Sequence, residues 1–218
     1  MKRNLSTHIY VVAFVISILI FVIGVYVGSV IDSTNLNTIS NEVSNVSGRV
    51  ASLQLLLLSE GNSTSFCPVY ISELQNLDNE IENIGYRLSF LEDEKQIFDN
   101  ELKRKYFVLE TESYLLSKKL KVLCKDESIL LIHFYSNKNC GTTCTEQGAA
   151  ILQARDQLVS EGYGVKLFSF DGELDSLVAE ALETEYNVTM YPTIVINEKT
   201  YLGFQSVEQI KNISKAEK

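Results

Sequence analysis

The sequence predicts an α/β fold at the C-terminal end of the chain, with the element order βαβαββα, preceded by one transmembrane helix and an α-helical coiled-coil stalk. Three observations predict it. A long uncharged run lies near the N-terminus, a heptad repeat of apolar residues follows, and short apolar runs then alternate with helical segments. The expected parts are a cytoplasmic N-terminus (1–8), a transmembrane helix (9–31), the stalk (34–125) and a C-terminal domain (127–218).

The uncharged run from Ile9 to Ile31 is long enough, at about 1.5 Å per residue, to cross roughly 30 Å of hydrocarbon. A cleavable signal peptide is the alternative, but its apolar core is usually only about 7–15 residues long. Lys2 and Arg3 precede the run, so the positive-inside tendency keeps the N-terminus in the cytoplasm. The sequence therefore predicts a single-pass membrane protein whose C-terminal domain is extracytoplasmic, where disulfides persist.

Composition narrows the functional classes. The net charge is -9 and the isoelectric point is about 4.8, which argues against nucleic acid as a partner because phosphate binding needs basic clusters. The four cysteines form two distant pairs, which suits disulfide or redox chemistry better than a zinc site. We expect no metal and no cofactor.

Three helices are expected in the stalk, at about 36–60, 68–94 and 98–124. Each carries a seam of apolar residues, and in the first helix their spacings alternate between three and four throughout, which is the seam of a coiled coil and allows the stalk to oligomerise. The first seam comprises Leu36, Ile39, Val43, Val46, Val50, Leu53 and Leu57; the second Leu74, Leu77, Ile81, Ile84, Leu88 and Leu91; the third Phe98, Leu102, Tyr106, Leu109, Leu116, Leu120 and Leu123.

The second and third helices can be read as one rod or as a hairpin. Cys67 begins the second helix, Cys124 ends the third, and a rod would hold them about 85 Å apart. A disulfide needs Cα atoms within about 7 Å, so only a hairpin that turns within Glu92–Gln96 allows the two cysteines to pair. We favour the hairpin. The pair then either staples the stalk or exchanges with the C-terminal domain.

From residue 129 the pattern changes to short strands and helices. Strands are expected at Ile129–Tyr135, Val165–Phe170, Thr193–Ile196 and Thr200–Phe204, and helices at 144–161, Leu174–Tyr186 and Val207–Ile213. A turn at 197–199 joins the last two strands. This order combines a parallel βαβ half with an antiparallel hairpin half.

These residues resemble the thioredoxin and protein disulfide isomerase family. The segment Ile132-His133-Phe134-Tyr135-Ser136 is followed by a cysteine pair that opens a helix, and Tyr191-Pro192-Thr193 precedes a strand, as around that family's cis-proline. Gly203-Phe204 resembles the glycine after the family's hairpin. The resemblance covers 128–214 and implies a thioredoxin-like fold and thiol–disulfide exchange.

By this resemblance Cys140 is the attacking thiol and Cys144 resolves the mixed disulfide, although the chain has Cys-x-x-x-Cys where the family has Cys-x-x-Cys. Thr143 and Glu146 fit a capping box that makes Cys144 the first helical residue, where the helix dipole stabilises a thiolate. The extra residue leaves open which cysteine is the nucleophile.

The resemblance also assigns residues around the cysteine pair. Pro192 would be the cis-proline, and Tyr191 and Thr193 beside it would contact the substrate. His133 stands where the family has a buried acid; it either shuttles a proton for Cys144 or is an ordinary hydrogen-bonded strand histidine.

The leading hypothesis is a membrane-anchored extracytoplasmic thiol–disulfide oxidoreductase that acts on protein thiols and disulfides, with a redox partner protein as a further expectation. A second is a Cu(I)-binding copper-delivery module that uses the Cys-x-x-x-Cys pair, although no histidine follows His133 to complete such a site. A third is a non-catalytic thioredoxin-fold interaction domain on a helical stalk. Reactivity of the Cys140 thiol separates the first from the third.

Overall fold

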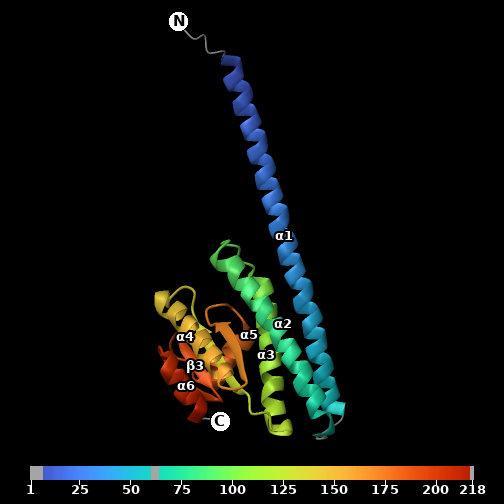
Figure 1. The fold of residues 1–218 in the computed structure, drawn as a ribbon, viewed down its shortest axis with the longest axis vertical. Helices are drawn as coiled ribbons and strands as arrows, with labels where there is room; N and C mark the ends of the chain where they lie inside the picture. Colours follow the sequence, from blue (N-terminus) through green and yellow to red (C-terminus); the bar gives the residue numbers. More distant parts are fainter. Residues whose placement is uncertain (1–6, 60–63, 217–218) are drawn as a thin grey trace. The chain divides into compact units, whose positions relative to one another are not determined.

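The computed structural model describes residues 7–59 and 64–216, except for the side chains of 7–9 and 27–34. The chain divides into two compact units, residues 1–42 and 43–218, and each is described by itself. The expected cytoplasmic N-terminus at 1–8 lies almost wholly outside the described residues. The described residues form ten helices and strands and one short 3-10 turn. Figure 1 colours them in sequence order.

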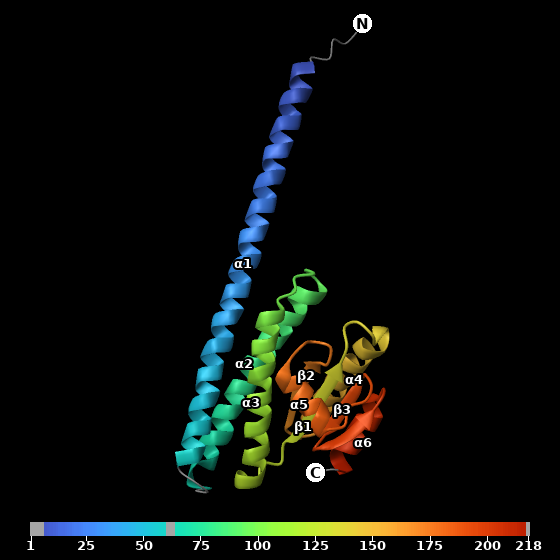
Figure 2. The ribbon, with the colours of Figure 1, turned by 180° about the vertical axis from the view of Figure 1, so that it is seen from behind.

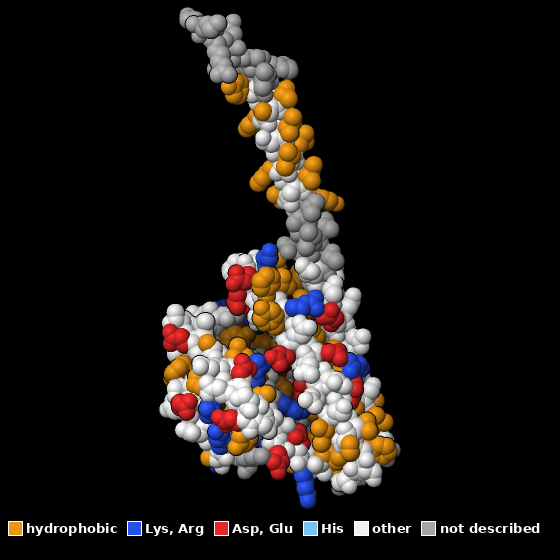
Figure 3. Space-filling model, viewed as in Figure 1, with side chains coloured by type: hydrophobic (Ala, Val, Ile, Leu, Met, Phe, Trp, Pro, Cys, Tyr) orange, Lys and Arg blue, Asp and Glu red, His pale blue; other side chains and the backbone are white. Residues whose placement is uncertain are grey.

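The first unit consists of the N-terminal part of helix α1 (Thr7–Ser59). Apolar side chains project from all around it between residues 10 and 26, as the space-filling view shows (Figure 3). We expected a transmembrane helix over 9–31. Over the described residues, however, no helix combines the length and apolarity that crossing a membrane requires.

That finding corrects two predictions. The predicted fold class was wrong to include a transmembrane helix. The predicted single-pass membrane localisation, with its cytoplasmic and extracytoplasmic sides, is wrong by the same observation. The predicted α/β class also understates the helices, because the described chain is mostly helical around one small four-stranded sheet.

The second unit begins with the C-terminal part of α1, followed by the 3-10 turn η1 (Thr64–Phe66) and by helices α2 (Cys67–Asp93) and α3 (Asn100–Cys124), both of which α1 contacts. Arg49 bridges α1 to Glu73 and Glu80 of α2, at 2.6 Å in each case. The seam residues expected in this unit are buried, with the exception of Phe98, which lies in the loop between α2 and α3, and Leu123, which is half-buried.

Helices α2 and α3 form the hairpin rather than the rod. The turn uses Gln96, whose φ is +54° and whose amide donates to two carbonyls at the end of α2. Asp99 then caps α3 by accepting the Leu102 N–H at 2.9 Å. At the other end of the hairpin, Cys67 and Cys124 form a disulfide with Cα atoms 5.4 Å apart.

The sheet has the strand order β2-β1-β3-β4, built from β1 (Ile129–Tyr135), β2 (Val165–Asp171), β3 (Thr193–Ile196) and β4 (Lys199–Leu202). Strands β1 and β2 are parallel, whereas β3 pairs antiparallel with both β1 and β4. With helices α4 (Gly141–Ser160), α5 (Leu177–Glu185) and α6 (Val207–Ala216), the order is βαβαββα. This part of the chain has a thioredoxin-like arrangement.

The sheet is covered on both faces (Figures 1 and 2). Helices α4 and α6 cover one face, where Leu131, Ile194 and Ile210 belong to one buried cluster. Helix α3 lies on the other face, where its Phe107 and Tyr114 rings meet Phe170 and Phe168 edge-on, with ring centroids 5.2 and 5.3 Å apart. The third helix of the expected stalk is therefore also a layer of the α/β core.

Candidate functional site

A disulfide between Cys140 and Cys144 lies at the start of α4, beyond the C-terminal end of β1. The Cα atoms are 5.5 Å apart. Cys140 is half-buried, whereas Cys144 is only 6% exposed. A partner thiol therefore reaches the Cys140 sulfur more easily than the Cys144 sulfur, which favours Cys140 as the atom that exchanges with another molecule.

Helix α4 begins earlier than predicted. It starts at Gly141, whose φ is +55°, and Cys140 itself occupies the position before it without a side-chain capping bond. The predicted capping box of Thr143 and Glu146 is therefore wrong, because Thr143 is already inside the helix. Cys144 is not the first helical residue, but it still lies in the first turn, where the positive end of the helix dipole favours a thiolate.

Pro192 follows a cis peptide bond after Tyr191 and is buried. Two sets of hydrogen bonds connect it to α4. The Gly203 N–H donates to the Pro192 carbonyl at 2.9 Å, and Gln147 exchanges two hydrogen bonds with the backbone of Gln205, at 2.6 and 3.1 Å. Gln147 follows Cys144 by one helical turn, so this chain of bonds fixes the proline loop against the end of α4 that carries the disulfide.

The side chains beside Pro192 already hydrogen-bond to other groups of the protein. Thr193 is buried and its hydroxyl donates to the Met190 carbonyl at 2.6 Å. The Tyr191 hydroxyl donates to Glu183 at 2.6 Å, and burial with this carboxylate raises the pKa of Tyr191. In the described hydrogen bonds, the backbone N–H and C=O of Tyr191 have no partner. The backbone of Tyr191, rather than the two predicted side chains, is what this loop offers to a bound chain.

His133 lies on β1 beneath α4. Its Cε1 atom is 4.0 Å from the place that a Cβ on Gly148 would occupy, and Gly148 shares a helix face with Cys144, one turn away. The side chain is 6% exposed, and its Nε2 atom has no hydrogen-bond partner. Burial lowers the pKa of His133 to about 4. Because Nε2 has no partner, His133 is not the fully hydrogen-bonded strand histidine of the second alternative. Its buried ring is uncharged at neutral pH and lies beneath α4.

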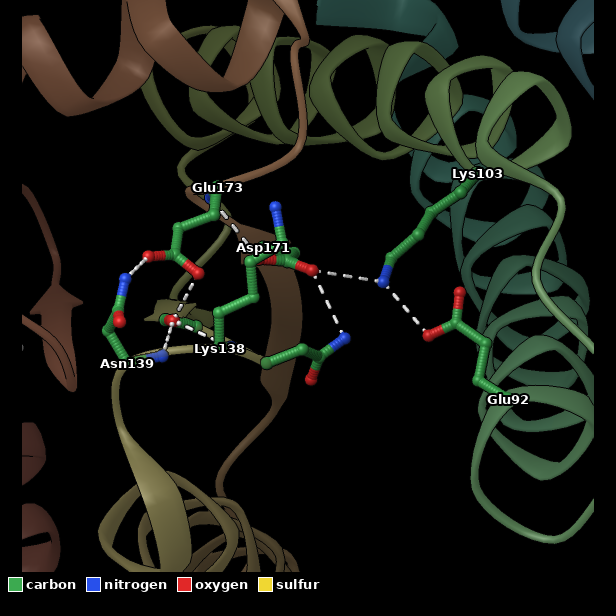
Figure 4. A network of polar contacts seen from close by, with 8 residues as sticks. Glu92, Lys103, Lys138, Asn139, Asp171 and Glu173 are labelled. Atoms are coloured by element: carbon green, nitrogen blue, oxygen red, sulfur yellow. Dashed lines mark hydrogen bonds and ion pairs between the residues drawn. The ribbon is translucent and has the colours of Figure 1, made fainter. Parts of the chain in front are cut away.

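A network of polar contacts holds the loop that precedes Cys140 (Figure 4). The Ser136 hydroxyl donates to Glu173 at 2.6 Å and accepts the backbone N–H groups of Lys138 and Asn139, at 3.1 and 2.8 Å. The Asn139 amide also donates to Glu173. These bonds lower the pKa of Glu173, so the carboxylate stays ionised. The approach to Cys140 is thus fixed before any substrate arrives.

The same network reaches the helical hairpin. Asp171, at the end of β2, accepts from the Asn137 amide at 3.1 Å and pairs with Lys103 of α3 at 3.2 Å. Lys103 also pairs with Glu92 of α2 at 2.9 Å, and all three charged side chains are nearly buried. Figure 4 shows Lys103 extending between the two carboxylates. The hairpin therefore positions the loop before Cys140.

The other disulfide lies at the opposite end of β1. Cys124 precedes the first residue of the strand, whereas Cys140 follows the last, and seven strand residues span about 20 Å. Cys67–Cys124 was predicted to staple the hairpin or to exchange with the C-terminal domain. Exchange between the two pairs within one molecule conflicts with this separation, and the structural assignment remains the better prediction.

Sequence reasoning missed Gln147, Gln205, Glu173, Lys103 and Asp171. The only signal for Gln147 was its spacing of three residues from Cys144, and polar residues at such spacings are common on helices. Lys103 lies between the apolar residues Leu102 and Tyr106 of the third seam, and the sequence pattern gives it no role of its own. Its two partners come from α2 and β2, far away in the sequence, so no local pattern marks the cluster.

Comparisons with known proteins add little to this geometry. No protein-family model and no curated protein matches the chain. Among solved structures, chloroplastic thioredoxin z matches with 20% sequence identity and a TM-score of 0.34 over 46% of this chain and 87% of that one. Among the residues that the structure describes, no group of three or more histidine, cysteine, aspartate or glutamate side chains is placed to hold a metal ion.

Proposed function

We propose that the protein is a thiol–disulfide oxidoreductase that acts on protein thiols and disulfides through Cys140 and Cys144. The observation that carries the proposal is the disulfide at the start of α4, which hydrogen bonds of Gln147 tie to the cis-proline loop, with Cys140 half-buried and Cys144 buried. A pair with unequal access suits exchange, because the outer sulfur meets the substrate and the inner sulfur completes the reaction.

In the reducing direction, the Cys140 thiolate attacks one sulfur of a substrate disulfide, and the other substrate sulfur leaves as a thiolate. The Cys144 thiolate then attacks the Cys140 sulfur of the mixed disulfide. This step releases the second substrate thiolate and reforms the Cys140–Cys144 disulfide. Two electrons pass from the protein dithiol to the substrate, which takes up two protons. Oxidation of a substrate dithiol is the same sequence in reverse, and a second dithiol or disulfide protein must restore the starting state.

His133 is proposed to accept the proton of the Cys144 thiol when that thiol becomes the attacking thiolate. Its Nε2 atom is buried without a partner beneath the helix face that carries Cys144. A neutral ring is needed for this role, and burial keeps the pKa of His133 well below 7. The proposed role of Tyr191 is to offer its backbone N–H and C=O to an extended substrate segment beside Pro192.

The decisive experiment compares two double variants. We expect C140S/C144S to lose at least about 99% of insulin-disulfide reduction with dithiothreitol as the electron donor, because both exchanging sulfurs are gone. The matched control is C67S/C124S, which removes the other disulfide and should keep turnover within about twofold at a temperature where both variants are folded. Equal turnover by C140S/C144S and the unaltered chain would refute the proposal.

A further inference from the structure

A groove runs along one edge of the sheet, where β2 is the outermost strand. It has a volume of about 710 Å³ and lies between α2, α4 and the edge of β2, with Gln75, Asn79, Val159 and the strand residues Val165–Phe168 among its lining. A second hollow of about 280 Å³ continues from it toward Tyr135 and shares Leu167 with it. Figure 3 shows the surface hollowed between α2 and α4.

The floor of this groove carries unused backbone groups. Ile129 donates to the Gly164 carbonyl, and Gly172 donates to the Tyr135 carbonyl, so the even-numbered residues of β2 face β1 in the parallel ladder. The odd-numbered residues therefore turn their N–H and C=O groups outward. In the described part of the chain, no hydrogen bond uses the outward groups of Val165 or Leu167.

Only one outward N–H in the middle of the strand is satisfied from within. Ser169 donates to both oxygens of Glu110, at 3.3 and 3.4 Å, and Glu110 in turn accepts from the Tyr106 hydroxyl at 2.9 Å. The Glu110 carboxylate thus stands where the carbonyl of a neighbouring strand would stand. Of the outward N–H groups of β2, Glu110 accepts only that of Ser169, so it closes one end of the edge and leaves Val165 and Leu167 available.

The charge of the groove selects the partner. More carboxylates than cations line the groove, and the two cations are Arg155 and Lys166. Both are already paired with α2 across the groove, Arg155 with Glu82 and Lys166 with Asp78. The other acidic groups in the lining include Glu127, Asp126, which accepts from Ser128, and Asp156, which also pairs with Arg155 at 3.1 Å. Burial raises the pKa of Glu110 to about 8, so the negative charge comes from the other carboxylates. The net field is negative, so it attracts a cationic segment.

We propose that the free edge of β2, between α2 and α4, is a docking site for an extended segment of a partner protein that is rich in lysine or arginine. The segment adds a strand to β2 by hydrogen bonding to Val165 and Leu167, and its cationic side chains lie against the groove carboxylates. Main-chain pairing supplies affinity, and the charge supplies selectivity. The site is remote from Cys140 and does not depend on exchange chemistry.

The test uses the full chain and labelled synthetic peptides, with binding followed by fluorescence anisotropy. We expect a short peptide of alternating lysine and valine to bind, and to bind more weakly as salt is added. Two matched peptides should bind at least about tenfold more weakly, which is about 1.4 kcal/mol. One replaces lysine by glutamate, and the other carries N-methyl groups on every second amide, which removes strand pairing on one edge.

Amide hydrogen exchange locates the contact. On binding, the Val165 and Leu167 amides should gain protection, while that of Phe168, which already bonds to β1, should not change. The variant D156N/E127Q should weaken binding about fivefold, whereas D175N, an exposed acidic control outside the groove, should not.

The proposal is overturned if the lysine peptide does not bind, if the N-methylated peptide binds equally well, or if bound peptide leaves Val165 and Leu167 unprotected. C140S/C144S should bind the lysine peptide as the unaltered chain does. A failure of the exchange reaction therefore leaves this result standing, and a failure of docking leaves the exchange proposal standing.

Discussion

The two ends of strand β1 carry two disulfides with nearly the same Cα separation, 5.4 Å for Cys67–Cys124 and 5.5 Å for Cys140–Cys144. One closes a sequence separation of 57 residues and ties α2 to α3, whereas the other closes a separation of only 4 at the start of a helix. Bond geometry therefore does not distinguish a staple from an exchanging pair. The surroundings do, because the second pair lies by the cis-proline loop and above the buried His133, whereas in both pairs one cysteine is half-buried and the other buried.

The largest expected effect tests the stapling role. By the loop-entropy estimate, removing the disulfide in C67S/C124S should lower the free energy of unfolding by about 4 kcal/mol, and removing the short one in C140S/C144S by about 2 kcal/mol. Urea denaturation of both variants without reductant measures the difference. If the short disulfide proves the more stabilising of the two, the assignment of roles to the two ends is wrong.

A second prediction concerns the buried charges that join the hairpin to the Cys140 loop. Lys103→Met should lower the free energy of unfolding by about 3 kcal/mol, because it leaves the nearly buried Glu92 and Asp171 carboxylates without a cation. It should also slow disulfide exchange, since Asp171 holds Asn137 in that loop.

The matched control is Lys105→Met on the same helix, where an exposed pair with Glu101 is lost. Its effect should stay below about 0.5 kcal/mol. Equal destabilisation by the two substitutions, measured by urea denaturation, would show that the buried cluster does not bear on stability.

A third prediction uses pH to test the buried His133, which lies near the second disulfide but not near the first. The pKa of His133 is about 4 in the folded protein and about 6.5 when unfolded, so the unfolded chain binds the proton more readily. The neutral ring stabilises the fold fully above pH 6.5, and this contribution is lost as the pH falls toward 4. Across that window the unaltered chain should lose about 3 kcal/mol relative to His133→Leu.

The measurement is the free energy of unfolding of both proteins from pH 7 to pH 4. If the two pH profiles run parallel, the ring is not buried as a neutral base. The exchange rate adds a separate readout: His133→Leu should slow resolution of the mixed disulfide at neutral pH, whereas attack by Cys140 should be unchanged.

The smallest expected effect lies at the other end of β1. The Lys121 ammonium donates to the Ser128 carbonyl at 2.6 Å and to the Asn197 side chain at 3.1 Å, which fixes the passage from α3 into the sheet. Lys121→Met should cost about 1 kcal/mol of unfolding free energy and leave the exchange rate unchanged. A loss of exchange activity in this variant would show that the two ends are coupled.

Local patterns in the sequence determined most of the secondary structure and indicated which cysteines pair. A short apolar run placed strand β1 at Ile129–Tyr135, because a buried strand needs apolar side chains on both faces. The positions of Cys67 and Cys124 favoured the hairpin between α2 and α3 over a rod. The pair Cys67–Cys124 followed from positions at helix ends, whereas Cys140–Cys144 was expected from the resemblance to the thioredoxin family. The start of α4 was missed because Gly141 enters the helix at positive φ, which the capping pattern at Thr143 concealed.

The tertiary structure alone decided what surrounds those cysteines. The sequence predicts helix α3 as one helix of a coiled coil, yet its aromatic residues cover a face of the sheet. Its Lys103 lies between carboxylates of α2 and β2. Likewise, the open edge of β2 depends on which strand is outermost. These features bring together residues that are distant in the chain. A local sequence pattern shows that a side chain is buried, but it does not show which distant element buries it.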